Sequence, residues 1–284
     1  MQVGTWCCFA GWAWGHLYWE GPLGVLLWHE ATLQWVTSWG VSWDTFVGTG
    51  ADDGLIQILQ RCVGWILFFA AIAAIAIRFS SHATRYASTV GISIGAGCLS
   101  VITLALYISA MQQLPMLIEH GGQVLMPICL LLAVHYGARS SITITITVVA
   151  VMLTFAGHGA YAAGMWPTPA NFYAMTTVIL GTDFETTQRM LFIAGVLDFG
   201  VCVGLLVPYC RRIAAGYAVV WGFLTAMARP VAGMSLELNY FAADQHLHQA
   251  ILRAPHFILP AFLVLIWSTD ESETPESRLG TKPS

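Results

Sequence analysis

The sequence predicts an all-α fold, a polytopic transmembrane helical bundle of about eight membrane-spanning helices. Of its 284 residues 57% are hydrophobic and only 9% are charged, whereas soluble domains carry about 25% charged residues. Apolar runs recur at lengths near the roughly 20 residues that cross a bilayer. Basic and acidic residues also fall in alternate loops, which is typical of a multi-pass membrane protein.

Eight apolar segments have about the required length. The fifth contains "ITITITVVAV", which alternates like a strand, but we expect a helix there because open sheet edges are not tolerated in lipid. The predicted spans are 3–19, 55–77, 87–110, 114–136, 140–165, 187–209, 213–233 and 250–267.

The charged loops predict the orientation of these spans. Basic residues fall on one side, which the positive-inside rule makes cytoplasmic. Both termini are then cytoplasmic, and we expect a bacterial inner-membrane protein. The cytoplasmic set is Arg78, Arg85, Arg139, Arg211, Arg212, Arg278 and Lys282, and the outer set is Glu20, Glu30, Asp44, Asp52, Asp53, Asp183, Glu185, Glu237 and Asp244.

Two of the segments outside the predicted spans have a distinctive composition. Residues 20–54 hold a run of tryptophans, and eight of the twelve tryptophans in the chain precede Asp44. Tryptophan prefers the membrane interface, so we expect an interfacial helical segment there. Residues 268–284 are polar and contain Pro and Ser, which predicts a disordered cytoplasmic tail.

The chain also repeats itself weakly. "FAGWAWGHLYW" from Phe9 resembles "FAGHGAYAAGMW" from Phe155, and the pairs Gln60-Arg61 and Gln188-Arg189 open the following spans. "LIEHGGQVLMP" (117–127) parallels "AILRAPHFILP" (250–260). We therefore predict two four-helix units, 1–136 and 137–267, related by a parallel repeat about an axis along the membrane normal.

Few strongly polar side chains lie within the predicted spans, and most fall in the outer part of their helices. Such groups are costly in a membrane, so they usually have partners. We expect an arginine to pair with Glu119 and another with Asp198, which leaves two arginines over. The candidate ligand-binding set is His16, Arg61, Glu119, His120, Gln123, His158, Arg189, Asp198, Arg229, Arg253 and His256.

Two interpretations of this polar set stay open. The arginines can snorkel to the headgroups and form ion pairs that only hold helices together. Alternatively, the set lines a polar cavity open to the outer face. Its excess positive charge would suit an anionic or carbonyl-bearing ligand such as a quinone headgroup, a small organic acid or a lipid phosphate.

Other classes of function find little support. The chain has no basic patch, which argues against a nucleic-acid partner. Its seven cysteines form no CxxC and fall in or beside apolar stretches, which is typical of packing residues. The sequence contains no Walker loop, no GxGxxG and no nucleophile–base motif. We predict no metal site, and the pair His246 and His248 is interpreted as solvated.

The four-helix unit resembles the DoxX-like superfamily of small bacterial membrane proteins. The residues that carry the resemblance are the Gly15-His16 ending of the first helix, Arg61 and Gly64 in the second, and Glu119-His120 with its proline. The resemblance covers 3–136 and, more faintly, 140–267. It implies a four-helix bundle in the cytoplasmic membrane and a redox or quinone partner.

Three function hypotheses follow. The first is a ligand-binding or redox-accessory, quinone-linked membrane subunit. The second is a small-anion transporter that uses the same arginines and histidines. The third is a b-type haem protein, for which His16, His120, His158 and His256 are candidate ligands, although no CxxCH is present. The partners compatible with these hypotheses are the lipid bilayer, a redox partner and a second copy of the chain.

Overall fold

The computed structural model describes residues 1–19, 21–49, 53–78, 81–235 and 243–272. The acidic residues Glu20, Asp52 and Glu237 and most of the predicted tail lie outside these ranges. The described residues form helices, with an isolated bridge between Gly48 and Asp53 and no sheet among them. The fold is therefore all-α, as the sequence predicts.

Six helical segments among the described residues are long and apolar enough to cross a membrane. Three are α5 (Leu55–Ala76), α6 (His82–Ser109) and the pair α7 (Leu114–Glu119) and α8 (Gly121–Tyr136). The others are α9 (Ser141–Ala162), α11 (Phe184–Leu206) and the pair α13 (Ala243–Ile251) and α14 (Pro255–Ser272). The chain is thus a multi-pass membrane protein by helix length and composition.

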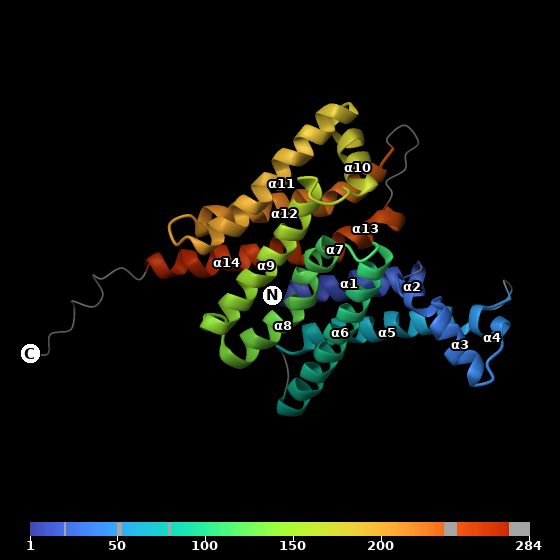
Figure 1. Cartoon of the computed structure of the whole chain (residues 1–284). Coiled ribbons are helices and arrows are strands. Elements are labelled where there is room, and N and C mark those ends of the chain that lie inside the picture. Colours follow the sequence, from blue (N-terminus) through green and yellow to red (C-terminus); the bar gives the residue numbers. More distant parts are fainter. Residues whose placement is uncertain (20, 50–52, 79–80, 236–242, 273–284) are drawn as a thin grey trace, which may run out of the picture.

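The remaining two predicted spans are also helical, as α1 (Gln2–Tyr18) and α12 (Arg211–Gly233). Helix α1 packs along α5, and α12 packs along α14. Figure 1 places α1 and α12 within the same bundle as the six apolar segments.

Shorter helices connect the long ones. The tryptophan-rich segment forms α2 (Gly24–Leu27), α3 (Glu30–Ser38) and α4 (Trp43–Val47), so its predicted helical character is confirmed. Helix α10 (Ala170–Leu180) was not predicted, because its 11 residues are too few for a span. Helix α14 continues to Ser272, so the polar tail begins later than predicted.

Two of the predicted spans are broken, which corrects the prediction of continuous helices. Helix α7 ends at Glu119 and α8 begins at Gly121, with His120 between them. Helix α13 ends at Ile251 and α14 begins at Pro255. Pro255 is the first residue of α14. Proline suits this position because the first N–H groups of a helix have no partner within the helix, so the N–H that proline lacks is not missed. The sequence alignment of 117–127 with 250–260 places the two breaks at matching positions, His120 and Arg253.

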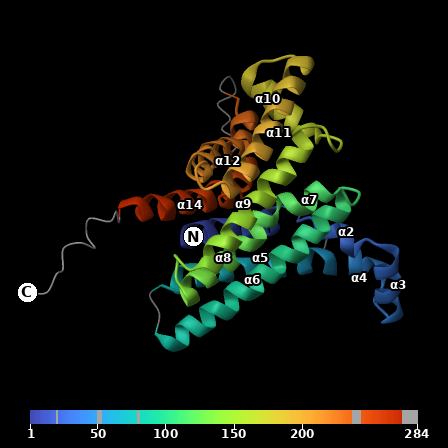
Figure 2. The ribbon, with the colours of Figure 1, turned by 60° about the vertical axis from the view of Figure 1, so that its left-hand side comes forward.

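The helix pairs of the two halves pack in the same way. Helix α1 packs on α5, and α9 packs on α11. The broken helices reach across the molecule, so α7 contacts α9 while α13 contacts α1. Figures 1 and 2 show α7 lying beside α9 in both views.

Two glycines at matching positions make these crossed contacts. A β-carbon on Gly11 would come within 2.5 Å of the backbone nitrogen of Leu252, and one on Gly157 would come within 2.5 Å of that of Glu119. Each glycine closes a Phe-Ala-Gly triplet, one of the echoes noted in the sequence. Because only glycine allows such an approach, the broken helices can lie directly against α1 and α9.

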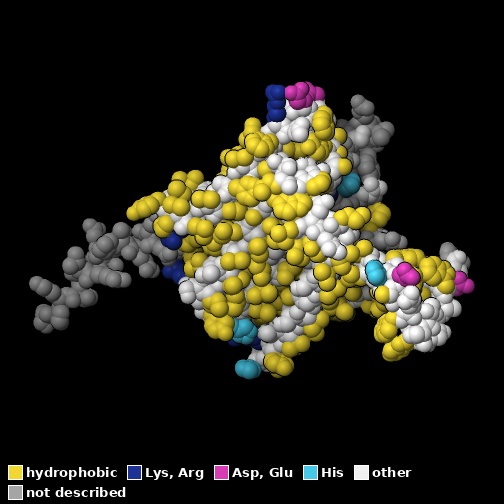
Figure 3. Space-filling view, viewed as in Figure 1, with side chains coloured by type: hydrophobic (Ala, Val, Ile, Leu, Met, Phe, Trp, Pro, Cys, Tyr) yellow, Lys and Arg dark blue, Asp and Glu magenta, His cyan; other side chains and the backbone are white. Residues whose placement is uncertain are grey.

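Two apolar cores fill the bundle. One gathers residues of α1, α5 and α6, and the other gathers residues of α8, α9, α11, α12 and α14. Large apolar side chains also face outward, among them Phe69, Phe192 and Val203. Figure 3 shows hydrophobic side chains across the middle of one face and charged ones near its edges. An apolar exterior of this kind is what a lipid environment requires.

Candidate functional site

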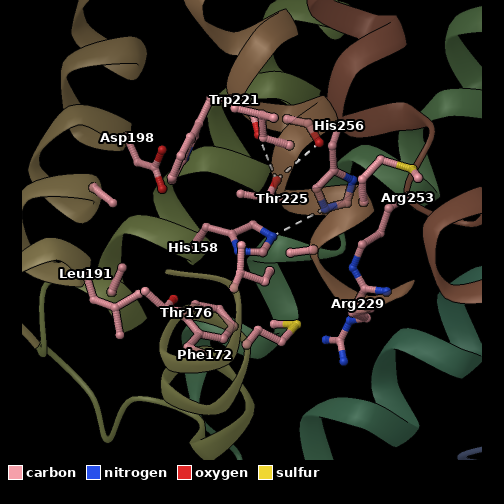
Figure 4. A pocket seen from close by; sticks show the side chains of 18 of the residues that line it. His158, Phe172, Thr176, Leu191, Asp198, Trp221, Thr225, Arg229, Arg253 and His256 are labelled. Atoms are coloured by element: carbon pink, nitrogen blue, oxygen red, sulfur yellow. Dashed lines mark hydrogen bonds between the residues drawn. The ribbon is translucent and has the colours of Figure 1, made fainter. Parts of the chain in front are cut away.

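A cavity of about 370 Å³ lies in the second half of the molecule, between α9, α10, α11 and α12. Most of its wall is apolar, with Phe155, Phe172, Met175, Leu191 and Leu224 among the lining residues. Figure 4 shows Phe172 and Leu191 on one side and Arg229, Arg253 and His256 on the other. Pockets for small molecules in proteins are generally concave and apolar with a few polar groups that fix orientation.

The polar end of this first cavity is built at the second helix break. Arg253 lies in the break and His256 lies in the first turn of α14. His158 comes from α9, and its Nε2 atom lies 3.3 Å from the Nε2 of His256. The two imidazole rings meet edge to face, and His158 also stacks on Phe172.

Arg229, from α12, completes this end. Figure 4 shows the guanidinium groups of Arg229 and Arg253 next to one another. Arg253 donates to the backbone oxygen of Gln249 at 2.9 Å. Within the described ranges no carboxylate lies within 4.0 Å of either guanidinium. Two adjacent cations that lack a directly paired anion favour a negatively charged or oxygen-rich ligand.

Glu119 lies next to two histidines, His120 and His158. Its carboxylate oxygens lie 3.7 Å from Nδ1 of His120 and 4.0 Å from Nδ1 of His158. It acts on Arg229 and Arg253 electrostatically, but from beyond ion-pair distance. The predicted Arg–Glu119 pair is therefore wrong, because the helix break turns this carboxylate toward imidazoles.

Asp198 occupies the opposite side of the first cavity. It is buried on α11, and Figure 4 shows it beside Trp221 and away from the arginines. Its Oδ1 atom has no hydrogen-bond partner among the described residues. The predicted Arg–Asp198 pair is also wrong, since no such pair is found in the described part of the chain.

Arg61 and Arg189 lie away from the cavities described here. Arg61 pairs with Asp53, and Arg189 pairs with Glu185 at 2.6 Å. Their side chains are 54% and 77% exposed. Exposed ion pairs contribute little to stability, and we leave these two arginines out of the site.

The first half holds a different pair at the position of the two histidines. Trp12 donates through its indole N–H to the amide oxygen of Gln123 at 2.7 Å. Aligning the two Phe-Ala-Gly triplets matches Trp12 to His158, and aligning the broken helices matches Gln123 to His256. The second half thus carries titratable imidazoles where the first half carries an indole and an amide.

A second cavity, of about 220 Å³, lies on the other side of the arginine pair. It is lined by His16 and His120 of the predicted set, and Arg229 and Arg253 line both cavities. His248 also lines it and is buried, so its interpretation as a solvated loop residue is wrong. Its place in an amphipathic helix, α13, could have indicated this.

Comparison with protein-family models, with curated proteins and with solved structures finds no match to this chain.

Proposed function

We propose that the chain is an integral membrane protein that binds an amphipathic ligand drawn from the bilayer. The headgroup lies at Arg229, Arg253 and the two imidazoles, and the apolar tail lies along α10, α11 and α12. The observation that carries the proposal is the pair of adjacent guanidinium groups at one end of an otherwise apolar cavity, with no directly paired carboxylate among the described residues.

An isoprenoid quinone is the ligand class that we favour. Guanidinium and imidazole N–H groups can donate to quinone carbonyls, and the positive charge of the arginines would stabilise an anionic reduced headgroup. The apolar wall would accept the first units of the tail. The same ligand class follows from the DoxX-like resemblance, and a redox-accessory subunit is the role that we propose.

The proposal is tested by equilibrium binding of a short-tailed quinone to the purified chain in lipid nanodiscs. We expect Arg253→Met to weaken binding by at least about tenfold, the loss of roughly 1.4 kcal/mol. Arg189→Met is the matched control, since it removes an exposed arginine that lines neither cavity. Equal affinities for both variants and the unaltered chain would leave the arginines as membrane anchors only.

The class of ligand is tested in the same preparation. Oleate offers an anionic headgroup and an apolar tail without quinone carbonyls. Binding of oleate but not of the quinone would refute the quinone assignment, and an amphipathic anion would then be the ligand class. Lipid extraction from the purified protein, followed by mass spectrometry, identifies which class accompanies it.

Transport of a small anion is the second candidate function. It is favoured by the two helix breaks, since discontinuous helices form the substrate sites of many transporters. Arg253 lies in one break and borders both cavities. Uptake of a labelled organic anion by proteoliposomes, abolished by Arg253→Met, would support transport over binding.

The haem hypothesis fits the site poorly. The Nε2 atoms of His158 and His256 lie 3.3 Å apart with their rings in contact, which leaves no room for a porphyrin between them. A reduced-minus-oxidised absorption spectrum of the purified protein tests this directly, and a Soret band would reverse our interpretation.

We also propose that the bundle is a duplicated four-helix unit with eight spans and cytoplasmic termini. Support comes from the matching helix breaks, the matching glycine contacts and the matching Trp12–Gln123 and His158–His256 pairs. The arrangement is that expected of a parallel repeat about an axis along the membrane normal. On this basis both cavities face the outer side of a bacterial inner membrane.

A further inference from the structure

We propose that the second cavity is a separate site for a small oxyanion that binds together with a proton, such as dihydrogen phosphate or hydrogen carbonate. This site goes beyond the proposed quinone site, although the two share Arg229 and Arg253. The lining of the second cavity is much more polar than that of the first, and its volume of about 220 Å³ suits a small ligand.

The cationic side of the second cavity comes from the arginine pair. Arg229 of α12 and Arg253 of the helix break both line it. Guanidinium groups bind oxyanions through charge-assisted hydrogen bonds, frequently two at a time. No carboxylate lines this cavity among the residues that the structure describes. An oxyanion in this cavity would place negative charge directly beside the two guanidinium groups.

Two imidazoles line the same space and have a fixed tautomer. Nδ1 of His16 lies 2.9 Å from the backbone oxygen of Trp12, and Nδ1 of His120 lies 2.8 Å from that of Met116. A carbonyl oxygen can only accept a hydrogen bond, so each Nδ1 carries the hydrogen. In the neutral ring the Nε2 atom is then an acceptor. The Nε2 atom of each ring can therefore accept a hydrogen bond from the ligand or take up a proton.

Of the two imidazoles, His16 gives the stronger evidence for a ligand. Its side chain is buried, at 2% exposure, and its Nε2 has no partner in the described structure. A β-carbon on Gly21 would collide with that ring edge, so the chain after α1 closes over it. A buried polar atom without a partner is costly unless something else fills the role. A ligand O–H that reaches this nitrogen past Gly21 would satisfy it.

The combination of arginines and acceptor imidazoles selects the chemistry of the ligand. Its anionic oxygens would face Arg229 and Arg253, and its O–H would face an imidazole. An oxyanion without an O–H can bind only if His16 or His120 takes up a proton and becomes a donor. In both cases one proton enters the site with the anion.

Two other titratable groups among the described residues lie close to this cavity. His248 of α13 lines it, and Glu119, which lines neither cavity, lies 3.7 Å from Nδ1 of His120. Because the arginines and the imidazoles line the same space, we expect the proton to enter together with the anion.

The test uses the full chain in nanodiscs of uncharged lipid, with isothermal titration calorimetry in buffers of different ionisation enthalpy. We expect phosphate to bind more tightly as the pH falls from 8 to 6. We expect sulfate, which has no O–H, to bind at least about tenfold more weakly at pH 8 and with uptake of one proton. No binding of either ion, or binding of sulfate without uptake of a proton, would overturn the proposal.

Two variants make the test specific. His16→Phe removes the acceptor, and we expect at least about tenfold weaker phosphate binding. Gly21→Ala places a methyl group against the same nitrogen and should weaken binding without altering any charge. His135→Gln is the control, because His135 is exposed at the other end of α8 and lies outside both cavities. Unchanged phosphate affinity in both His16→Phe and Gly21→Ala would refute the assignment.

The proposals for the two sites can be tested independently. His256→Phe alters the first cavity, so we expect it to reduce quinone binding and to leave phosphate binding intact. Loss of phosphate binding in His256→Phe as well would mean that the two cavities are one site. Arg253→Met should weaken both ligands.

Discussion

The backbone of Gly157 packs so closely on that of Glu119 that a β-carbon on the glycine would lie 2.5 Å from the Glu119 nitrogen. We expect Gly157→Ala to lower the free energy of unfolding in detergent by about 1–3 kcal/mol, the usual cost of overpacking. Gly200→Ala is the control, because nothing lies within 4 Å of the added carbon. Gly11→Ala should behave like Gly157→Ala if the two halves are equivalent.

The two histidines of the first cavity can be exchanged for the pair found in the first half. The double variant His158→Trp and His256→Gln should rebuild the Trp12–Gln123 contact in the second half. We expect the fold to be kept and quinone binding to be lost, because the imidazoles are gone and an indole fills part of the cavity. Thermal melting and ligand binding are the two measurements. A variant that still binds quinone with unchanged affinity would contradict the proposed headgroup position.

Thr154 secures the first helix break. Its hydroxyl accepts a hydrogen bond from the backbone N–H of Gly122 at 3.0 Å. Thr154→Val leaves that buried N–H without a partner, so we expect a loss of about 1–3 kcal/mol in unfolding free energy. Thr225→Val is matched to it, since Thr225 bonds only to carbonyls of its own helix, and it should be close to neutral. Equal melting temperatures for the two variants would contradict this role.

Asp183 caps the N-terminus of α11. The backbone N–H and the hydroxyl of Thr186 donate to its carboxylate and lower its pKa from the ordinary value. Because the folded pKa is the lower one, the cap is at full strength above about pH 3.9 and weakens as the pH falls toward the folded pKa. The protection of the first turn of α11 against hydrogen exchange, measured relative to the intrinsic rate at each pH, should therefore fall at acidic pH. Asp183→Asn should remove this pH dependence while keeping much of the protection at pH 7.

The orientation of the chain is tested through a natural cysteine. Cys210 is exposed in the turn before α12, next to Arg211 and Arg212. With cytoplasmic basic loops, a membrane-impermeant maleimide should label Cys210 only after the inner membrane is opened. Cys62 is also exposed and is replaced by serine in the test chain. Thr182→Cys, on the opposite side, should label in intact spheroplasts, and the reverse pattern would invert the proposed topology.

Much of the architecture could be predicted from the sequence because hydropathy acts locally. Long apolar runs that lack charge must lie in lipid, and in lipid they must be helical. Even the strand-like run in α9 therefore forms a helix. The alignment of 117–127 with 250–260 also placed His120 opposite Arg253, which is where the two breaks occur.

The breaks themselves were not predicted, because each apolar run is continuous in composition. Glycine and proline are tolerated in membrane helices, and what they do depends on the neighbouring helix. Gly121 and Gly122 lie against α9, with the side chains of Leu153 and Thr154 next to them. That approach is a property of the packed bundle and not of the segment.

The sequence by itself determined that this chain is an all-helical membrane protein with a small set of ionisable groups within or near the ends of its apolar segments. It could not separate Arg229 and Arg253 from Arg61 and Arg189, since all four lie at similar positions along apolar segments. Only the tertiary structure decided that two of them face shared interior space while two pair with nearby acids on the surface. The physical reason is that hydropathy fixes the depth of a residue, whereas the rotation of each helix and the position of its break are set by packing against its neighbours.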